Sequence, residues 1–180
     1  MFLIAITVGL CMAYFAIRVL FGVFFGIKLS RPSNSSAGRK AMVRALRSIC
    51  LIFAFSVIGY VIALNIPDAE TGNRILHGFG GGFMAFFVCF LAAKDLRADA
   101  ISRGLGGGVV GPNRFQFFVL SVLLVAALGI GNEIMEFLFQ NHTKLIFAVG
   151  VNDTWLDLIS NLIGSVIAAI CFVPFFNTKK

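Results

Sequence analysis

The chain of 180 residues is 59% hydrophobic and 13% charged, with a mean hydropathy of +0.95. Soluble domains carry about 25% charged residues, so this composition excludes an ordinary soluble enzyme and indicates an integral membrane protein. The formal net charge is +7, but the basic residues are confined to particular loops, which argues against nucleic-acid binding.

Five apolar stretches can be drawn along the sequence. Each reaches about the 20 residues that a helix needs to cross the hydrocarbon core. Backbone groups in lipid must form hydrogen bonds internally, which leaves helix as the expected form. We therefore predict an all-α fold, a five-helix transmembrane bundle forming a single domain over residues 1–180. The predicted spans are about 2–27, 48–66, 75–93, 115–140 and 155–176.

The basic residues indicate the orientation of these helices. Six Lys and Arg residues lie in the first loop, four in the third and two at the C-terminus, against one in each of the other two loops. Loops rich in Lys and Arg stay on the cytoplasmic side of a membrane. The asymmetry predicts an N-terminus outside, a C-terminus inside and a location in the cytoplasmic (inner) membrane.

The first three spans carry few polar residues. Arg18 lies within the first span, where it either extends to the interface or pairs inside the bundle. Residues 39–48 have a helical pattern and lead into the second span. Gly78 and Gly82 in the third span form a GxxxG step that favours close helix packing, and residues 94–114 are predicted as a loop. The four cysteines all fall in spans without CxxC spacing, so we expect neither disulfides nor thiolate metal sites.

The fourth and fifth spans concentrate the acidic residues. Glu133 and Glu136 are three residues apart, while Asp153, Asp157 and Asn161 follow a four-residue spacing, so each set shares one helix face. The predicted topology brings both faces to the outer side of the membrane, at the same depth as Arg74 and His77. Carboxylates within a membrane are costly and mark functional sites. The sequence thus predicts one polar site on helices three, four and five.

Structural roles are the alternative for several of these residues. Asp153 precedes the predicted fifth helix and suits an N-cap, and the N-terminal end of that helix favours both aspartates through its dipole. His77 alone fits an interfacial histidine, and Asn161 fits a hydrogen bond between helices. Glu133, Glu136 and Asp157 are deeper and like-charged, so they are harder to explain structurally.

Two kinds of chemistry suit this set. Four carboxylates, from Glu133, Glu136, Asp153 and Asp157, are candidate ligands for a divalent cation. His77 together with Glu133, Glu136 and Asp157 is the candidate catalytic group for acid–base chemistry, with Arg74 and Asn161 as substrate-contacting or structural residues. A ferritin-like di-iron centre is not expected, because neither glutamate has a histidine three residues later.

The same residues resemble the VanZ-like membrane proteins and the related YjdF-type family of bacteria. Arg74 and His77 match the basic residue and histidine of the first VanZ-like element, and Glu133 matches its acidic helix. Asp157, Asn161 and Gly164 match the final Asp-x-x-x-Asn-x-x-Gly element. Glu136 stands where VanZ-like proteins prefer Gln, and Glu-x-x-Glu is closer to the YjdF type. The resemblance covers roughly residues 70–165 and implies a small multi-pass protein of the bacterial envelope, in a family linked to glycopeptide resistance.

The resulting functional prediction is an envelope membrane protein whose outward-facing His/carboxylate site binds or modifies an amphiphilic component of the cell envelope. Arg74 and His77 would meet an anionic head group, and the candidate cofactor is a divalent cation. The expected partners are membrane lipids or a lipid-linked envelope component, with a homo-oligomer left open. Two alternatives remain: an ion- or proton-coupled transporter, and a non-catalytic envelope assembly factor.

Overall fold

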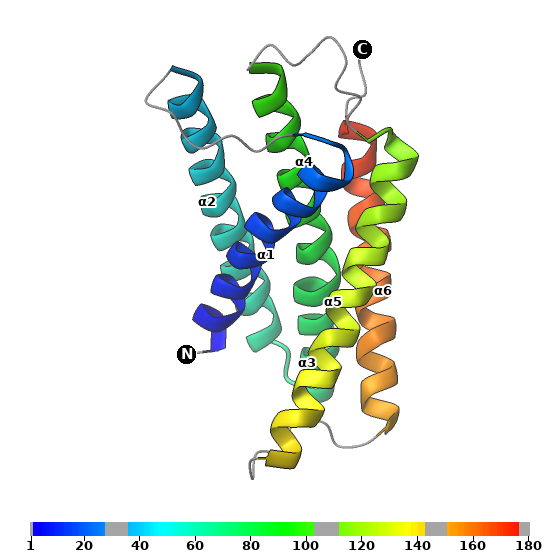
Figure 1. Cartoon of the computed structure of the whole chain (residues 1–180). Coiled ribbons are helices and arrows are strands. Elements are labelled where there is room, and N and C mark those ends of the chain that lie inside the picture. The colour runs from blue at the N-terminus through cyan, green and yellow to red at the C-terminus, as the bar shows by residue number, and fades with distance from the viewer. Residues whose placement is uncertain (1, 28–35, 103–111, 143–150, 177–180) are drawn as a thin grey trace.

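A computed structural model describes residues 2–27, 36–102, 112–142 and 151–176. These ranges are almost entirely helical, with short non-helical stretches at 25–27, 65–68, 112–113 and 176 (Figure 1). The elements are α1 (Phe2–Phe24), α2 (Ser36–Leu64), α3 (Ala69–Leu76), η1 (His77–Met84), α4 (Ala85–Ser102), α5 (Arg114–His142), α6 (Val151–Phe172) and the 3-10 turn η3 (Val173–Phe175). The all-α prediction is confirmed.

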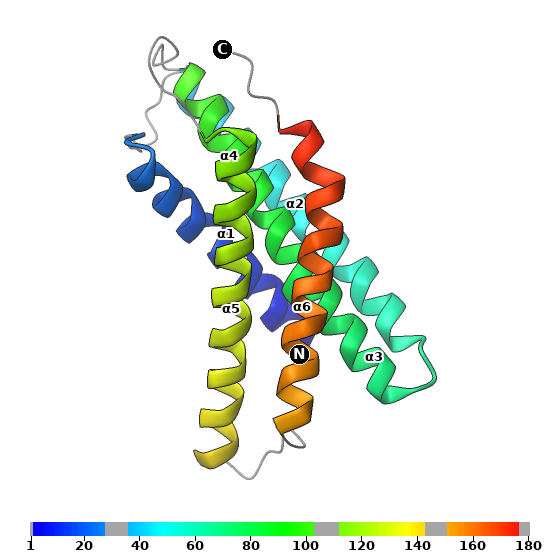
Figure 2. The ribbon, with the colours of Figure 1, turned by 90° about the vertical axis from the view of Figure 1, so that its right-hand side faces the viewer.

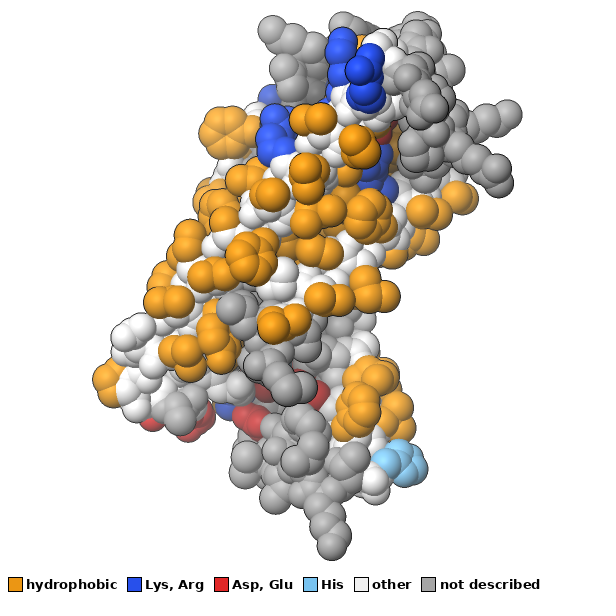
Figure 3. Space-filling model, turned by 90° about the vertical axis from the view of Figure 1, so that its left-hand side faces the viewer, with side chains coloured by type: hydrophobic (Ala, Val, Ile, Leu, Met, Phe, Trp, Pro, Cys, Tyr) orange, Lys and Arg blue, Asp and Glu red, His pale blue; other side chains and the backbone are white. Residues whose placement is uncertain are grey.

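Five helical rods are long and apolar enough to cross a membrane, as predicted. Their candidate spans are Thr7–Phe24, Ser36–Leu64, Glu70–Ser102, Arg114–His142 and Asn152–Phe175. Large apolar side chains are exposed along the first, second, fourth and fifth of these rods, and on the face drawn in Figure 3 exposed apolar side chains form a broad zone below a group of basic side chains. This surface suits lipid rather than water.

Two predicted boundaries need correction. The segment 39–48 is helical as expected, but it continues into the second span as the single helix α2, Ser36–Leu64. The third span does not end at residue 93, because α4 runs to Ser102 and so takes in residues predicted as a loop. The glycine-rich segment 106–111 lies outside the described residues.

The third span is the centre of the bundle. Within its most apolar 18-residue window, 56% of the Glu70–Ser102 span is buried, against 22–28% for the corresponding windows of the other four spans. It packs against all of the other long helices, and α1 crosses obliquely over α2 and α4 (Figure 1). The same bundle is seen from the side of α5 and α6 in Figure 2. Its aromatic contacts include Phe86 and Phe90 against Phe117 of α5, and Phe87 against Phe172 of α6.

The start of this span is held by a helix cap. The Asp68 carboxylate accepts hydrogen bonds from the Thr71 amide at 2.8 Å and from its hydroxyl at 2.5 Å. An aspartate at this position satisfies an amide that the helix leaves unbonded. The same two bonds lower the pKa of Asp68, which lies between two candidate spans. The cap sets where α3 begins and therefore where Arg74 and His77 stand.

Between α3 and α4 the backbone forms a π-helix, His77–Met84, with the sequence HGFGGGFM. π-Helical turns are rare and often occur at functional sites. Here the glycines also permit close packing on α6. A Cβ added to Gly164 would overlap the Gly78 carbonyl, and one added to Gly82 would overlap the Asn161 carbonyl. The packing role predicted for Gly78 and Gly82 is confirmed, and this contact, the glycine seam, fixes η1 against α6.

Candidate functional site

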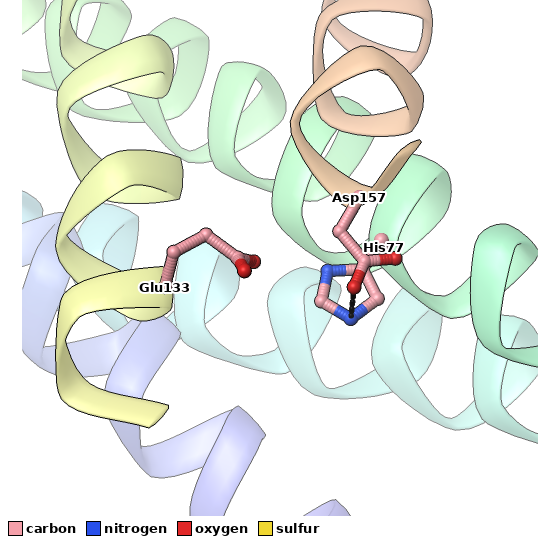
Figure 4. A group of neighbouring side chains, drawn as sticks. All are labelled: His77, Glu133 and Asp157. Atoms are coloured by element: carbon pink, nitrogen blue, oxygen red, sulfur yellow. Dashed lines mark ion pairs between the residues drawn. The ribbon is translucent and has the colours of Figure 1, made fainter. Parts of the chain in front are cut away.

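Three of the predicted residues meet where η1, α5 and α6 converge. His77, Glu133 and Asp157 each offer one ligand atom, and these atoms lie within 4.8 Å of one another. His77 Nε2 and Asp157 Oδ2 lie 3.5 Å apart. Figure 4 shows the Glu133 carboxylate extending from α5 toward that pair. Asp157 is 2% exposed and Glu133 8%, so the group is shielded by the bundle.

The spacing of this trio, the His77–Glu133–Asp157 cluster, suits a metal ion after a small contraction. Zinc bonds to nitrogen and carboxylate oxygen are about 2.0–2.2 Å long, which places two ligand atoms of a tetrahedral site about 3.4 Å apart. Side-chain shifts below about 1 Å would bring the three atoms into that range. One imidazole and two carboxylates from three helices form a donor set of the catalytic type, with positions left for water or substrate.

Arg74 is fully engaged by aspartates on α6. Its guanidinium donates to Asp153 Oδ1 at 2.6 Å and to Asp157 Oδ1 at 2.5 Å, and it also reaches the Asp153 carbonyl at 3.2 Å. Glu70 lies further out, at 3.6 Å. An anionic head group would have to displace these partners to reach Arg74, so the arginine positions Asp157 rather than presenting a free positive charge.

The interpretation of Asp153 as a residue before the fifth helix is wrong. Helix α6 begins at Val151, which places Asp153 inside its first turn, where the carboxylate pairs with Arg74. The predicted four-residue face of Asp153, Asp157 and Asn161 is nevertheless present, because Arg74 binds the first two residues and Asn161 follows one turn deeper. Asp153 does not belong to the His77–Glu133–Asp157 cluster.

Glu136 also lies apart from the cluster. It accepts a hydrogen bond from Asn132 Nδ2 at 2.6 Å and faces a neighbouring cavity. Glu133 Oε1, in contrast, is buried without a hydrogen-bond partner among the described residues. The two glutamates predicted as equivalent ligands therefore have different surroundings.

A cavity of about 440 Å³ adjoins the cluster. One part of its wall is polar, and the rest is built from small and apolar residues of α1, α3, η1, α4 and α5. The polar lining residues are Asn73, His77, Asn132, Glu136 and Asn161, and the apolar ones are Gly9, Leu10, Ala13, Leu76, Gly80, Gly81, Ala85, Leu128 and Gly129. Asn161 is 4% exposed, and its Oδ1 lacks a partner in the described part of the chain. An apolar cavity with a few convergent polar groups is the usual form of a ligand site.

The charge balance of the region is negative. Glu133, Glu136, Asp153 and Asp157 carry four carboxylates, while Arg74 is a cation that pairs with the two aspartates. With all four ionised and His77 neutral, the sum is −3. Buried like charges are stable only when they bind a cation, pair or take up protons. The unpartnered oxygens of Glu133 and Asn161 point to the same need for a positive or hydrogen-bond-donating partner.

Sequence reasoning missed a second buried polar group at the opposite end of the bundle. Asp95 and Asp99 of α4, predicted to lie in a loop, are 1% and 2% exposed. Asp95 accepts hydrogen bonds from Tyr14 at 2.7 Å and from Ser48 at 2.6 Å. Asp99 pairs with the guanidinium groups of Arg18 and Arg44, which confirms that Arg18 pairs inside the bundle.

These six residues form what we call the polar ladder, defined as Tyr14, Arg18, Arg44, Ser48, Asp95 and Asp99. Each helix contributes two residues four positions apart, so both lie on one helix face. Arg18 Nη1 also donates to the Tyr14 hydroxyl at 3.2 Å, which connects the group around Asp95 with the group around Asp99. The four-residue spacing of Asp95 and Asp99 was the signal available in the sequence. Their partners come from α1 and α2, far away in the chain.

Comparison with known proteins gives a family but no solved structure. No solved structure matches the chain. The chain is similar to the heme A synthase of Ruegeria pomeroyi, with 27% identity over 132 residues, which is 69% of this chain and 33% of that protein. It thus spans about a third of the length of this relative.

The family description "Predicted membrane protein (DUF2238)" matches residues 70–178, which include the π-helix, the His77–Glu133–Asp157 cluster and Arg74. These residues make up more than half of the 180-residue chain. The chain is therefore a multi-pass integral membrane protein that belongs to the DUF2238 family of predicted membrane proteins.

Proposed function

We propose that this protein binds an amphiphilic component of the cell envelope, with the polar head at the His77–Glu133–Asp157 cluster and the apolar part in the adjoining cavity. The observation that carries the proposal is the cavity of about 440 Å³, whose apolar wall ends at His77, Glu136 and Asn161. A tail needs only van der Waals contact and space, which glycine and alanine provide. The head group needs the polar partners that the cluster supplies.

A divalent cation held by His77, Glu133 and Asp157 is the second part of the proposal. Arg74 is engaged by Asp153 and Asp157, so it offers little positive charge to a phosphate or carboxylate. A bound cation would offset the negative sum of the region and provide the site for an anionic head group. Glu136, on the cavity wall beside the cluster, is then the candidate general base if the bound component is also modified.

The sequence resemblance to VanZ-like proteins supports an envelope component as the ligand, and the predicted topology places the site on the outer side of the cytoplasmic membrane. A cation- or proton-coupled permease is the second candidate. It is favoured by buried carboxylates at both ends of the bundle, Glu133 and Asp157 at one end and Asp95 and Asp99 at the other. A proton flux in proteoliposomes that depends on both groups would support the permease.

Cation binding is tested by titrating the purified full-length protein with Zn²⁺ and Mn²⁺ in an isothermal calorimeter. We expect binding at one site, lost in His77→Gln and retained in His142→Gln. His142 is the matched control because it is exposed at the last residue of α5 and does not line the cavity. Equal binding by both variants would remove the cation from the proposal.

Amphiphile binding is tested by mass spectrometry of lipids that co-purify with the protein. Gly129→Leu should deplete the bound species, because Gly129 lines the cavity and a Cβ there already lies 3.1 Å from Asn161 Nδ2. Gly131→Leu is the control, since nothing lies within 4 Å of its Cβ position. The cavity has no role in binding if both variants retain the same lipids as the native protein.

A further inference from the structure

The polar side chains on the wall of the cavity of about 440 Å³ present mainly hydrogen-bond acceptors. Asn132 Nδ2 donates to Glu136 Oε1 at 2.6 Å, which leaves the Asn132 carbonyl oxygen as the amide atom open to a ligand. Asn73 Nδ2 is directed in the same way at Asp157 Oδ1, at 3.5 Å. An ionised carboxylate such as that of Glu136 only accepts hydrogen bonds. A ligand that meets this part of the wall therefore has to donate them.

Asn161 of α6 adds a buried acceptor to the same wall. The residue is 4% exposed, and its Oδ1 has no hydrogen-bond partner in the part of the chain that the structure describes. A Cβ added to Gly81 would lie 2.1 Å from this oxygen, so Oδ1 stands beside a residue of the cavity wall that has no side chain to cover it. A buried acceptor without a partner is costly, and a donor on a ligand would remove that cost.

The cavity wall also lacks the side chains that bind a quaternary ammonium. Phe, Trp and Tyr make up 13% of the chain, yet none of them is among the described residues that line this cavity. Trimethylammonium groups donate no hydrogen bonds and are recognised by aromatic cages. A primary ammonium, in contrast, has three N–H donors, which suit a wall of carbonyl and carboxylate oxygens.

The charge of the region favours the same group. The four carboxylates and Arg74 sum to −3 with His77 neutral, and a divalent cation at the cluster would leave −1. An anionic head group would make this balance more negative. An ammonium beside Glu136 offsets the negative charge there, and a zwitterionic head group that carries both phosphate and ammonium adds no net charge. Charges removed from water are stable only when such partners are present.

We propose, on the basis of the function proposed above, that the bound amphiphile is a zwitterionic phospholipid with a primary ammonium, such as phosphatidylethanolamine. The ammonium donates to Asn132, Glu136 and Asn161. The phosphate lies at the cation held by the cluster, and His77 connects the two positions because it belongs to the cluster and lines the cavity. The acyl chains extend along the apolar part of the wall.

The test compares four dioleoyl phospholipids whose head groups have the same charge but differ in their N–H donors. Phosphatidylethanolamine has three donors, its N-methyl and N,N-dimethyl derivatives have two and one, and phosphatidylcholine has none. Binding is measured from the rise in the unfolding temperature of the full-length protein as each lipid is added to dodecylmaltoside micelles. We expect the apparent affinity to fall along this series and to be about tenfold lower for phosphatidylcholine, since a charge-assisted hydrogen bond is worth about that factor.

Two substitutions remove acceptors from the wall. Glu136→Gln and Asn161→Leu should each reduce the preference for phosphatidylethanolamine over phosphatidylcholine, and the double variant should abolish it. Asn152→Leu is the matched control, because Asn152 is exposed on α6 and does not line the cavity, and it should keep the full preference. Unfolding temperatures without added lipid show whether each variant folds, and Glu136→Gln keeps the shape of the side chain at a half-buried position.

Equal affinities for the four lipids would overturn the ammonium site while leaving amphiphile binding in place. A preference that persists in the double variant would do the same. Gly129→Leu narrows the cavity and should weaken the binding of all four lipids alike. If Gly129→Leu binds every lipid as the native protein does, or if the native protein binds none of them, the proposed function fails together with the ammonium site.

Discussion

Glu133 and Asp157 are buried carboxylates of one cluster, yet their electrostatic surroundings are opposite. Asp157 receives Arg74 on one oxygen and faces His77 with the other. Glu133 has Oε1 without a partner among the described residues and shares its region with other carboxylates. Removing the charge from each should therefore have different effects on stability, even though both residues belong to the proposed cation site.

We expect Glu133→Gln to keep or slightly raise the thermal stability, because the amide retains the shape and relieves repulsion between like charges. Asp157→Asn should lower the free energy of unfolding by up to about 3 kcal/mol, because it removes one partner of a buried ion pair while Asp153 still binds Arg74. Both variants should lose cation binding. Thermal unfolding in detergent measures the stabilities, and a loss of stability in Glu133→Gln would show that its charge is balanced by a partner in the folded protein.

A larger loss of stability is expected from a substitution in the polar ladder, because Asp99 pairs with two arginines. Asp99→Asn would leave Arg18 and Arg44 facing each other without a counter-charge, which should cost about 3–5 kcal/mol of unfolding free energy. Asp68→Asn is the matched control, because asparagine caps a helix as well as aspartate does. Chemical denaturation measures the free energy of unfolding of both variants. Similar stabilities would mean that the ladder contributes no net stability.

At the scale of elements, the glycine seam between η1 and α6 holds the two helices that carry His77 and Asp157. Gly164→Ala should separate them, because its Cβ would overlap the Gly78 backbone, which cannot move aside as a side chain can. We expect reduced thermal stability together with loss of cation binding. Gly131→Ala, at an open position of α5, should leave cation binding unchanged and the stability equal or slightly higher. Unchanged cation binding in Gly164→Ala would show that the cation site does not depend on the glycine seam.

The elements also show where sequence reasoning succeeds. Long apolar runs predicted all five helical rods, because a helix is the structure that satisfies backbone groups in lipid. The shared faces of Glu133 with Glu136 and of Asp157 with Asn161 follow from helical periodicity, and together with the topology they predicted the site region. In contrast, Lys94 to Asp99 look like a loop because their charges lower the local hydropathy. The burial of Asp95 and Asp99 depends on hydroxyl groups and arginines contributed by two other helices, which no local pattern reveals.

The sequence also did not predict the individual contacts inside the site. Arg74 binds two aspartates, and Glu136 lies apart from the cluster. Both outcomes depend on small differences in the direction of side chains that helical spacing alone does not determine. A glycine-rich stretch predicts close packing, but it does not distinguish an α-helix from the π-helix His77–Met84. Residue types and spacing therefore predicted the region, and tertiary contacts determined which of its residues lie together in the cluster.

For the whole molecule, the charge distribution predicts an N-terminus outside and a C-terminus inside. Single cysteines placed at positions 35 and 71, in a chain whose four native cysteines are replaced, test this with a membrane-impermeant thiol reagent. We expect position 71 to be labelled in intact cells and position 35 only after the membrane is opened, because basic loops remain cytoplasmic. The reverse pattern would place the His77–Glu133–Asp157 cluster on the cytoplasmic side.

The π-helix has a consequence for how the two ends of the third span are aligned with each other. Arg74 lies before the π-helix and His77 is its first residue, while Asp95 and Asp99 follow it in α4. The wider turns of the π-helix therefore set the angle about the helix axis between the first pair of side chains and the second. Each residue of an α-helix turns the chain by about 100°. Deleting one glycine from this segment would rotate Arg74 and His77 away from α6 while Asp95 and Asp99 stayed in the ladder. The number of residues in HGFGGGFM therefore determines how far the two ends of the third span are rotated relative to each other. The length of this segment matters to the cluster as much as its composition does.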